Sequence, residues 1–207
     1  PNSASEVIMR SSFAHGIGGI LSADIAVPEH EREVRFYASI LTTGSAPLWR
    51  DDLMNNRGEP VIGLGERSAE YERLPLQWMP HFQVADVGAS AARALELGGT
   101  ELMHGKDEDG RSQWAVLVDP MGAAFGLIPV VDGESEAAGD AESVGSIAWL
   151  TLVVPDVAST CAFYAQVVGW SIDAADTDGA ALMRRPDGGP AAEIRHASGE
   201  DAELPPV

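Results

Sequence analysis

Apolar and polar positions between residues 77 and 130 follow a period of two, then a helical period, then a period of two again. Apolar side chains at every second position predict a strand at 79–84. Apolar residues three and four positions apart predict a helix at 87–97. A short strand at 100–103 and two strands on either side of the turn at 119–122 complete a β-α-β-β-β unit.

The same pattern occurs twice more along the chain. In the first copy, a strand at 21–27 precedes a helix that begins at Pro28-Glu29, and strands follow at 48–54 and 61–65. The third copy has a strand, a helix and three strands in the same order, at 147–154, 156–168, 170–174, 180–184 and 191–196. Repetition at this period predicts an α+β fold that is built from one repeated unit.

Changes in composition divide the chain into segments. Residues 131–146 are rich in Asp, Glu, Gly, Ser and Ala without an apolar period, which is typical of a solvated linker. We expect an N-terminal tail at 1–18, a first domain at 19–130 made of units 19–66 and 77–130, this acidic linker, and the first half of a second domain at 147–207.

The last residues, Leu204-Pro205-Pro206-Val207, are similar to Leu74-Pro75-Leu76-Gln77, which leads into the second unit. We therefore expect a fourth unit to complete the second domain, supplied either by a further C-terminal segment or by a second chain. A further segment is the preferred explanation, because an open sheet edge beside an exposed apolar face promotes aggregation.

Composition excludes several classes of function. The formal net charge of −19 and the pI near 4.4 disfavour binding to nucleic acid or to an anionic membrane, both of which attract clustered Lys and Arg. No apolar run is long enough to span a bilayer. Cys161 is the single cysteine and cannot form an internal disulfide, so we expect a reducing, cytoplasmic location.

The middle unit carries motifs that resemble a known family. A strand, Val84-Ala85-Asp86-Val87, a helix, Leu97-Gly98-Gly99 and Val118-Asp119-Pro120-Met121-Gly122-Ala123 are similar to the pattern of the vicinal oxygen chelate superfamily. Its members include glyoxalase I, extradiol dioxygenases and bleomycin-resistance proteins. The resemblance covers about residues 19–196 and implies that units one and two pair into a half-open, eight-stranded barrel around a pocket, in a tandem-domain protein whose second domain is incomplete here.

Members of that superfamily hold a divalent metal with His, Glu or Gln from the first and last strands of paired units. The resemblance places the first-strand ligands at Ser22, Met79 and Trp149 and the terminal glutamate at Gly126. None of these side chains is a suitable metal ligand, and Glu66 alone would supply a single carboxylate. We therefore expect no cofactor, and a divalent metal is the disfavoured alternative.

Strand alternation selects the residues that face the implied pocket. They are Ser22, Asp24, Ala26, Met79, His81, Gln83, Ala124, Gly126 and Ile128. Asp24 and His81 could approach each other as a carboxylate that orients an imidazole, which is an acid–base pair. The simpler alternative is a structural hydrogen bond, or two separately solvated groups. The expected ligand-binding residues are Ser22, Met79, Gln83, Trp114 and Gly126.

Other candidate residues carry less information. His104 and the run 106–111 are expected in a loop at the pocket mouth, and the run lacks the glycine and glutamate spacing of a calcium loop. The indoles of Trp78, Trp114 and Trp149 could stack on a flat ligand, although core packing is the simpler role. Cys161 lies on the apolar face of a helix and is expected in the core.

Two classes of function are consistent with these features. The first is a metal-independent protein that holds an aromatic or apolar small molecule in the pocket of the first domain. The second is a lyase, isomerase or dioxygenase of the same superfamily that uses a residual metal or the pair Asp24 and His81. In either class the expected partner is a small molecule, and the expected state is a monomer or a homodimer.

Overall fold

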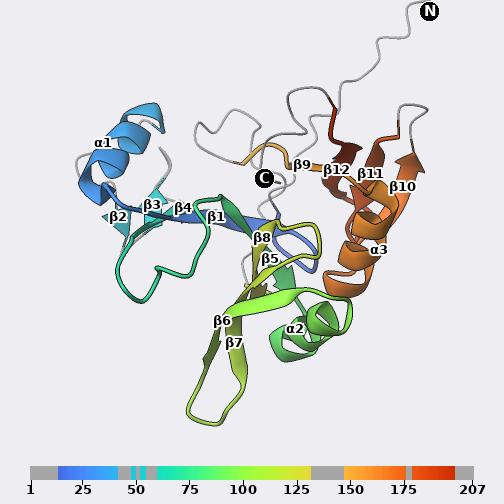
Figure 1. Ribbon diagram of the computed structural model, residues 1–207, viewed down its shortest axis with the longest axis horizontal. Coiled ribbons are helices and arrows are strands. Elements are labelled where there is room, and N and C mark those ends of the chain that lie inside the picture. The colour runs from blue at the N-terminus through green and yellow to red at the C-terminus, as the bar shows by residue number, and fades with distance from the viewer. Residues whose placement is uncertain are drawn as a thin grey trace, which may run out of the picture.

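The computed structural model describes residues 14–41, 48–49, 52–54, 60–131, 147–175 and 179–198. Within these segments, three helices and twelve strands follow one another in three runs of the same order (Figure 1). No helix in the described segments is both long and apolar enough to cross a membrane. The predicted threefold repeat of one α+β unit is confirmed.

The bounds of the elements are as follows. The first unit contains β1 (Ile20–Val27), α1 (His30–Ile40), β2 (Leu48–Trp49), β3 (Asp52–Met54) and β4 (Pro60–Glu66). The second contains β5 (Met79–Val84), α2 (Val87–Glu96), β6 (Thr100–Lys106), β7 (Ser112–Val118) and β8 (Ala124–Pro129). The third contains β9 (Thr151–Val154), α3 (Val157–Val167), β10 (Ser171–Ala175), β11 (Ala181–Arg184) and β12 (Pro190–His196).

The prediction of one strand at 48–54 was wrong. Two short strands, β2 and β3, pair with each other in antiparallel fashion, with Leu48 opposite Leu53 and Trp49 opposite Asp52. The apolar positions at 48–54 do not show that the chain pairs with itself there, because such pairing depends on contacts between the two short strands.

The prediction that His104 lies in a loop was also wrong. His104 is part of β6 and lies opposite Ala115 in the ladder with β7. The ladder continues beyond Met103 because β7 provides pairing partners as far as Ser112. The loop itself is restricted to 107–111, where the Asp107 carboxylate accepts hydrogen bonds from backbone N–H groups within the loop.

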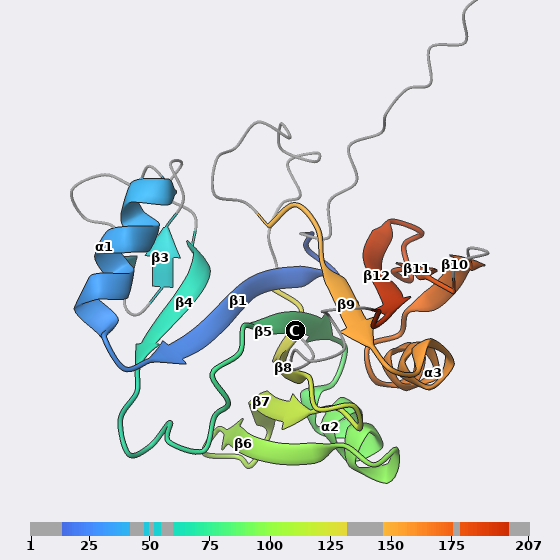
Figure 2. The ribbon, with the colours of Figure 1, turned by 45° about the horizontal axis from the view of Figure 1, so that its top comes forward.

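The first two units form one curled sheet in the order β2-β3-β4-β1-β5-β8-β7-β6 (Figure 2). In each unit the first and last strands are parallel neighbours, namely β1 with β4 and β5 with β8. The units meet where β1 and β5 run antiparallel, with Asp24 opposite Met79. The predicted pairing of units one and two in a single sheet is therefore confirmed.

The third unit forms a separate four-stranded sheet in the order β10-β11-β12-β9. This order repeats that of each earlier unit, with β9 and β12 as parallel neighbours. Residues 204–207, which suggested a fourth unit, lie outside the described residues, and the completion of the second domain stays a prediction.

One apolar core joins the second and third units. Helices α2 and α3 contact each other, and the core includes residues from both sheets. Its aromatic side chains have neighbouring ring centroids between 5.0 and 6.0 Å apart and are Phe82, Phe125, Phe163, Tyr164 and Trp170. Cys161 is 1% exposed within this core, as its position on the helix predicted.

Candidate functional site

The two faces of the large sheet differ in their packing. Phe82, Phe125 and Leu127 point into the core beneath the helices. Met79 and Ala124, which alternate with them, belong to a smaller apolar cluster on the concave face. The predicted alternation of β5 and β8 is confirmed, so the candidate site lies on the concave face.

Asp24 of β1 and His81 of β5 meet on this face. The imidazole Nδ1 lies 3.5 Å from the Asp24 Oδ2 and 3.1 Å from the carbonyl oxygen of Met79. Both neighbouring oxygens accept hydrogen bonds, which assigns the proton of the neutral ring to Nδ1 and leaves the lone pair at Nε2. The other carboxylate oxygen, Oδ1, accepts a hydrogen bond from the Gly63 N–H at 3.2 Å. The pair thus forms an oriented carboxylate–imidazole unit.

Two glycines make room for this pair. A Cβ atom at Gly63 would lie 2.4 Å from the Asp24 Cγ, and one at Gly126 would lie 2.1 Å from the His81 Cδ2. Both distances are too short for any real Cβ atom, so each polar side chain lies directly over a glycine of the neighbouring strand. The sequence predicts Gly126 as a residue of the site but does not indicate Gly63. Only the strand register shows that Gly63 lies beside Asp24.

One end of the concave face is already filled. Met79 is 3% exposed and packs with Leu74, while Tyr71 packs against the same cluster. Leu74 and Tyr71 come from the connection between β4 and β5, which crosses this end of the face. Ser22 lies opposite His81 in the ladder and is half-buried, so the open part of the face is centred on these two residues and Asp24.

Trp114 of β7 lies further along the same face. Its side chain is 39% exposed, and it lies opposite Gly105 in the ladder with β6. A Cβ atom at Gly105 would be 2.3 Å from the indole, so the ring rests on the bare backbone of β6. Counting strand spacings from His81 through β8 to β7 gives a backbone separation of about 12 Å from Trp114. The face therefore has an exposed aromatic ring beyond a polar pair.

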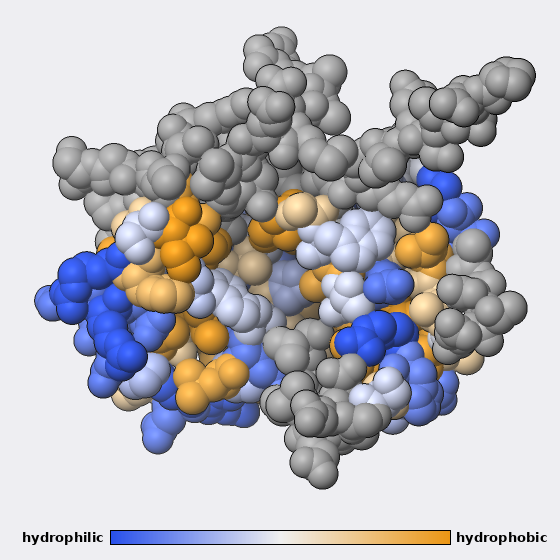
Figure 3. All heavy atoms as spheres, turned by 90° about the horizontal axis from the view of Figure 1, so that it is seen from above, coloured by the Kyte–Doolittle hydropathy of each residue, from blue (hydrophilic) through white to orange (hydrophobic). Residues whose placement is uncertain are grey.

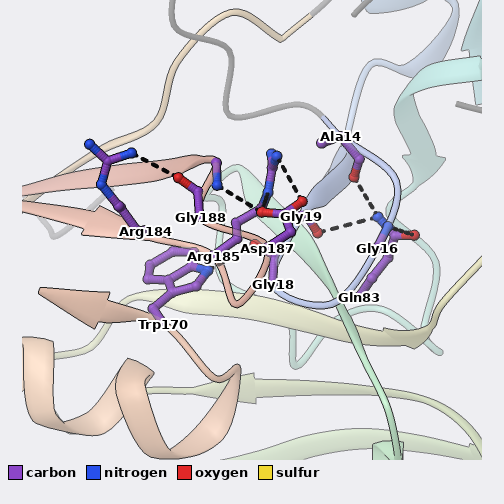
Figure 4. Close-up of polar contacts among 11 residues, drawn as sticks. Ala14, Gly16, Gly18, Gly19, Gln83, Trp170, Arg184, Arg185, Asp187 and Gly188 are labelled. Atoms are coloured by element: carbon purple, nitrogen blue, oxygen red, sulfur yellow. Dashed lines mark hydrogen bonds and ion pairs between the residues drawn. The ribbon is translucent and has the colours of Figure 1, made fainter. Parts of the chain in front are cut away.

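Gln83 has a different role from the one expected. It is 0% exposed, and its amide holds the loop that precedes β1 (Figure 4). The amide nitrogen donates to the Ala14 carbonyl oxygen at 2.7 Å, and the amide oxygen accepts from the Gly16 and Val131 N–H groups. The geometry makes Gln83 an anchor for this loop, and its side chain has no exposed surface for a ligand.

The same loop contacts the third unit. The Trp170 indole N–H donates to the Gly18 carbonyl oxygen at 2.8 Å (Figure 4). A Cβ atom at Gly18 would lie 3.0 Å from that indole, and this glycine adopts a positive φ of 78°. Gly18 thus allows this loop to pack closely against the third unit.

The donor set on the concave face does not fit the metal site of the superfamily. Asp24 and His81 are one carboxylate and one imidazole, whereas a bound metal needs three or more such ligands. The described residues contain no group of three His, Cys, Asp or Glu that could hold a metal ion. A terminal glutamate at Gly126 would also collide with the imidazole of His81.

The remaining candidates lie away from this arrangement. Trp78 packs edge-on against Tyr37, with ring centroids 5.4 Å apart, in the core beneath α1. Trp149 is half-buried before β9, and Glu66 is exposed at the end of β4. Hydrophilic side chains gather over the α1 end of the molecule (Figure 3), where Glu29 and Arg32 form an exposed ion pair.

A cavity of about 360 Å³ lies on the other side of the sheet, between α3 and the turn at 119–121. Asp119 borders this cavity and is 4% exposed. Its carboxylate accepts hydrogen bonds from the Met121 and Ala123 N–H groups and from the Tyr164 hydroxyl at 3.1 Å. Burial raises the pKa of Asp119, and burial together with the nearby Asp119 charge raises the pKa of Tyr164 well above its usual value. The hydrogen bond between Asp119 and Tyr164 is thus a structural contact between the second and third units.

Comparison with known proteins adds a family match. The profile of a family described as glyoxalase-like domain matches residues 22–128, about half of the chain. The matched range includes all of the concave face described above.

Two curated proteins show sequence similarity. The chain is 33% identical over 96 residues to the anthracycline biosynthesis protein DauV of Streptomyces sp. (strain C5), a match that covers 46% of this chain and 34% of that protein. It is 32% identical over 96 residues to the anthracycline biosynthesis protein DnrV of Streptomyces peucetius, with the same coverage. The matched part is thus about a third of the length of these relatives.

Solved structures share the fold at low identity. A variant of homoprotocatechuate 2,3-dioxygenase from B. fuscum has a TM-score of 0.58 and 17% identity, over 94% of this chain and 57% of that one. A Mn(II)-bound glyoxalase from Novosphingobium aromaticivorans has a TM-score of 0.54 and 15% identity, over 88% of this chain and 63% of that one. At these identities the likeness supports the fold alone.

Proposed function

Because the chain belongs to the glyoxalase-like domain family of the vicinal oxygen chelate superfamily, we propose that its first domain binds an aromatic or largely apolar small molecule on the concave face. The ligand is held without any bond being broken. The binding needs no metal and no macromolecular partner.

The observation that carries this proposal is the composition of the concave face. Glycine and apolar residues surround one polar group, made of Ser22, Asp24 and His81, and Trp114 exposes 39% of its surface above the backbone of Gly105. A flat ring can stack on this indole, while Asp24 and His81 hydrogen-bond a hydroxyl or carbonyl group at the other end. The names of DauV and DnrV place those relatives in anthracycline biosynthesis, which favours a fused-ring ligand.

Native mass spectrometry of the untagged protein is the first test of this proposal. It reports bound metal, co-purified ligand and oligomeric state in one spectrum. A metal-free protein that carries an organic adduct supports the proposal, and a stoichiometric divalent metal contradicts it.

Titration with a dihydroxyanthraquinone, followed by tryptophan fluorescence, tests the position of the site. Trp114→Ala removes the stacking surface and is expected to raise Kd about tenfold, the equivalent of an aromatic pair. Trp149→Ala is the matched control, since it removes a half-buried tryptophan outside the first domain. Equal losses in both variants, or a loss only in Trp149→Ala, would exclude the concave face.

A second function is favoured by one observation, the orientation of His81. With its proton on Nδ1 facing Asp24, the ring presents a basic Nε2 to a ligand. A lyase or an isomerase could begin by removing a proton from carbon at this atom. Anthrone is a suitable probe, because its methylene protons are acidic.

Hydrogen–deuterium exchange at the anthrone methylene group distinguishes the two functions. General-base catalysis predicts exchange above the solvent rate that falls at least about a hundredfold in His81→Ala. If the wild-type protein exchanges these protons only at the solvent rate, general-base catalysis is excluded and binding is the function of the site.

A further inference from the structure

Two irregularities in the β6–β7 ladder bring three polar side chains onto the helix-facing side of the sheet. Glu101 and His104 are three positions apart, a spacing that puts side chains on opposite faces of a regular strand. The register shifts between Glu101 and Met103, so that Glu101 lies opposite Leu117 and His104 opposite Ala115. Leu117 and Ala115 are both buried in the helix-side core, which places their partners on that side.

The second irregularity reorients Ser112. The ladder steps from Trp114 to Ser112 on β7 while β6 advances only from Gly105 to Lys106. This bulge turns Ser112 away from the face of Trp114 and towards α2, where a Cβ atom at Gly88 would lie 2.9 Å from the serine Oγ. Bulges that redirect a side chain in this way are over-represented next to active sites.

The three residues form a hydrogen-bonded chain. His104 Nδ1 lies 2.9 Å from the Glu101 Oε2, and His104 Nε2 lies 2.8 Å from the Ser112 Oγ. A carboxylate only accepts hydrogen bonds, so the neutral imidazole carries its proton on Nδ1 and accepts the serine O–H at Nε2. This is the order of groups that activates a serine: nucleophile, base and orienting carboxylate, each within 3 Å of the next.

The surroundings suit such a serine. The His104 side chain is 15% exposed and that of Glu101 is 35% exposed, while Ser112 is half-buried, so the imidazole is largely shielded from solvent. Ser112 lies beside the first turn of α2, whose leading N–H groups point out of the helix. Asp86 caps one of them, that of Ala89, at 2.9 Å.

We propose that Ser112, His104 and Glu101 form an esterase-like site that reacts with small, unhindered acyl esters, separate from the concave face. The Ser112 Oγ attacks the acyl carbon as its proton passes to His104 Nε2, and that proton then leaves with the alcohol. Water, deprotonated by the same nitrogen, releases the carboxylic acid and regenerates the serine. Glu101 is a positioning residue that holds the imidazole in the reactive tautomer.

A fluorophosphonate probe applied to the full chain tests this proposal, with the labelled peptide identified by mass spectrometry. Label is expected on Ser112 and absent in Ser112→Ala. In His104→Gln the labelling rate is expected to fall at least about a hundredfold, the contribution of general-base catalysis. Circular dichroism of each variant checks that the fold is retained.

Ser159 is the matched internal control. Like Ser112, it lies at the first turn of a helix, in this case α3. Its hydroxyl donates a hydrogen bond directly to the Asp156 carboxylate at 2.6 Å, without a histidine between the two groups. Label on Ser112 that depends on His104, with none on Ser159, supports the proposal. No label on Ser112 in the folded protein, or label that is unchanged in His104→Gln, overturns it.

The role of Glu101 has its own readout. In Glu101→Gln the kcat for hydrolysis of p-nitrophenyl acetate is expected to fall at least about tenfold while KM is unchanged, because the imidazole is no longer held in the reactive tautomer. The rate at which Ser112 is labelled should fall by a similar factor. An unchanged kcat in this variant contradicts a positioning role for Glu101.

Discussion

Asp24 and His81 lie close together because the strands beside them lack side chains at two positions. Gly63 and Gly126 face these residues in the ladder, and a methyl group at either would occupy the space of the carboxylate or the imidazole. The polar pair therefore depends on four residues from β4, β1, β5 and β8. A site built in this way is sensitive to the smallest possible substitution.

Gly126→Ala tests that dependence. The added Cβ atom would meet His81 at 2.1 Å, so the imidazole must leave Asp24. We expect a loss of unfolding free energy of about 1–3 kcal/mol, as for overpacking, together with weaker ligand binding. Denaturant titration measures the first effect. Gly65→Ala is the control, since its Cβ atom would have ordinary contacts of 3.9 Å, and a comparable loss in this variant would remove the steric explanation.

At the level of elements, the helices differ in how they begin. The side chains of Asp86 and Asp156 accept hydrogen bonds from the backbone of the first turn of α2 and α3. Glu29, in the same position before α1, makes no such bond. None of the residues of α1 is buried, whereas α2 and α3 pack against each other. The helices of the second and third units thus have a side-chain cap at their first turn, whereas the helix of the first unit has none.

Asp86→Ala should show the value of a cap. Loss of the bond to the Ala89 N–H is expected to lower the unfolding free energy by about 1 kcal/mol. Glu29→Ala removes no cap bond and only an exposed ion pair with Arg32, so it is expected to have a smaller effect than Asp86→Ala. Thermal and denaturant unfolding of both variants measures the difference. Equal losses of unfolding free energy would show that the cap bond of α2 does not stabilise the protein.

The sequence predicts elements well where their pattern is local. The bounds of β5 and nearly those of α2 follow from periodicity, because each residue's face depends on its immediate neighbours. The ladder of β6 could not be predicted as far as Lys106, since its extension depends on β7. The same limit hid Ser112 and Glu101, because bulges, which no periodicity shows, decide where they point.

For the whole molecule, the important contact joins the second unit to the third. Asp119 and Tyr164 are 45 positions apart in the chain and form a buried hydrogen bond. The sequence predicts the helix at 156–168, which contains Tyr164, and the turn at 119–122, which contains Asp119, but their pairing depends on how the units dock. The proximity of Asp24 and His81 could be predicted, in contrast, because adjacent first strands are inherent in the repeat.

Tyr164→Phe is expected to weaken this contact in a pH-dependent way. The loss of the hydroxyl leaves a buried carboxylate oxygen without its donor and should cost about 1–3 kcal/mol at neutral pH. The pKa of Asp119 is raised by burial, so the carboxyl group contributes stability below its unfolded pKa near 4, and this is lost as the pH rises through the folded pKa. The cost of Tyr164→Phe should therefore shrink in acid, where Asp119 is neutral.

Urea denaturation across this pH range provides the measurement. Asp119→Asn keeps an acceptor but removes the ionisation, so adding Tyr164→Phe to it should give a cost that does not change with pH. A pH-dependent cost in that double variant would assign the effect to another group.

The bond from the Trp170 indole to the Gly18 carbonyl oxygen joins residues 152 positions apart. During synthesis the glycine loop leaves the ribosome long before its partner exists, so the start of β1 completes its packing only after the third unit has emerged. Contacts of such long range form late and slow the folding of a chain. The glycine loop is therefore translated before the third unit but reaches its native environment only after it, and until then it depends on the Gln83 amide of the second unit.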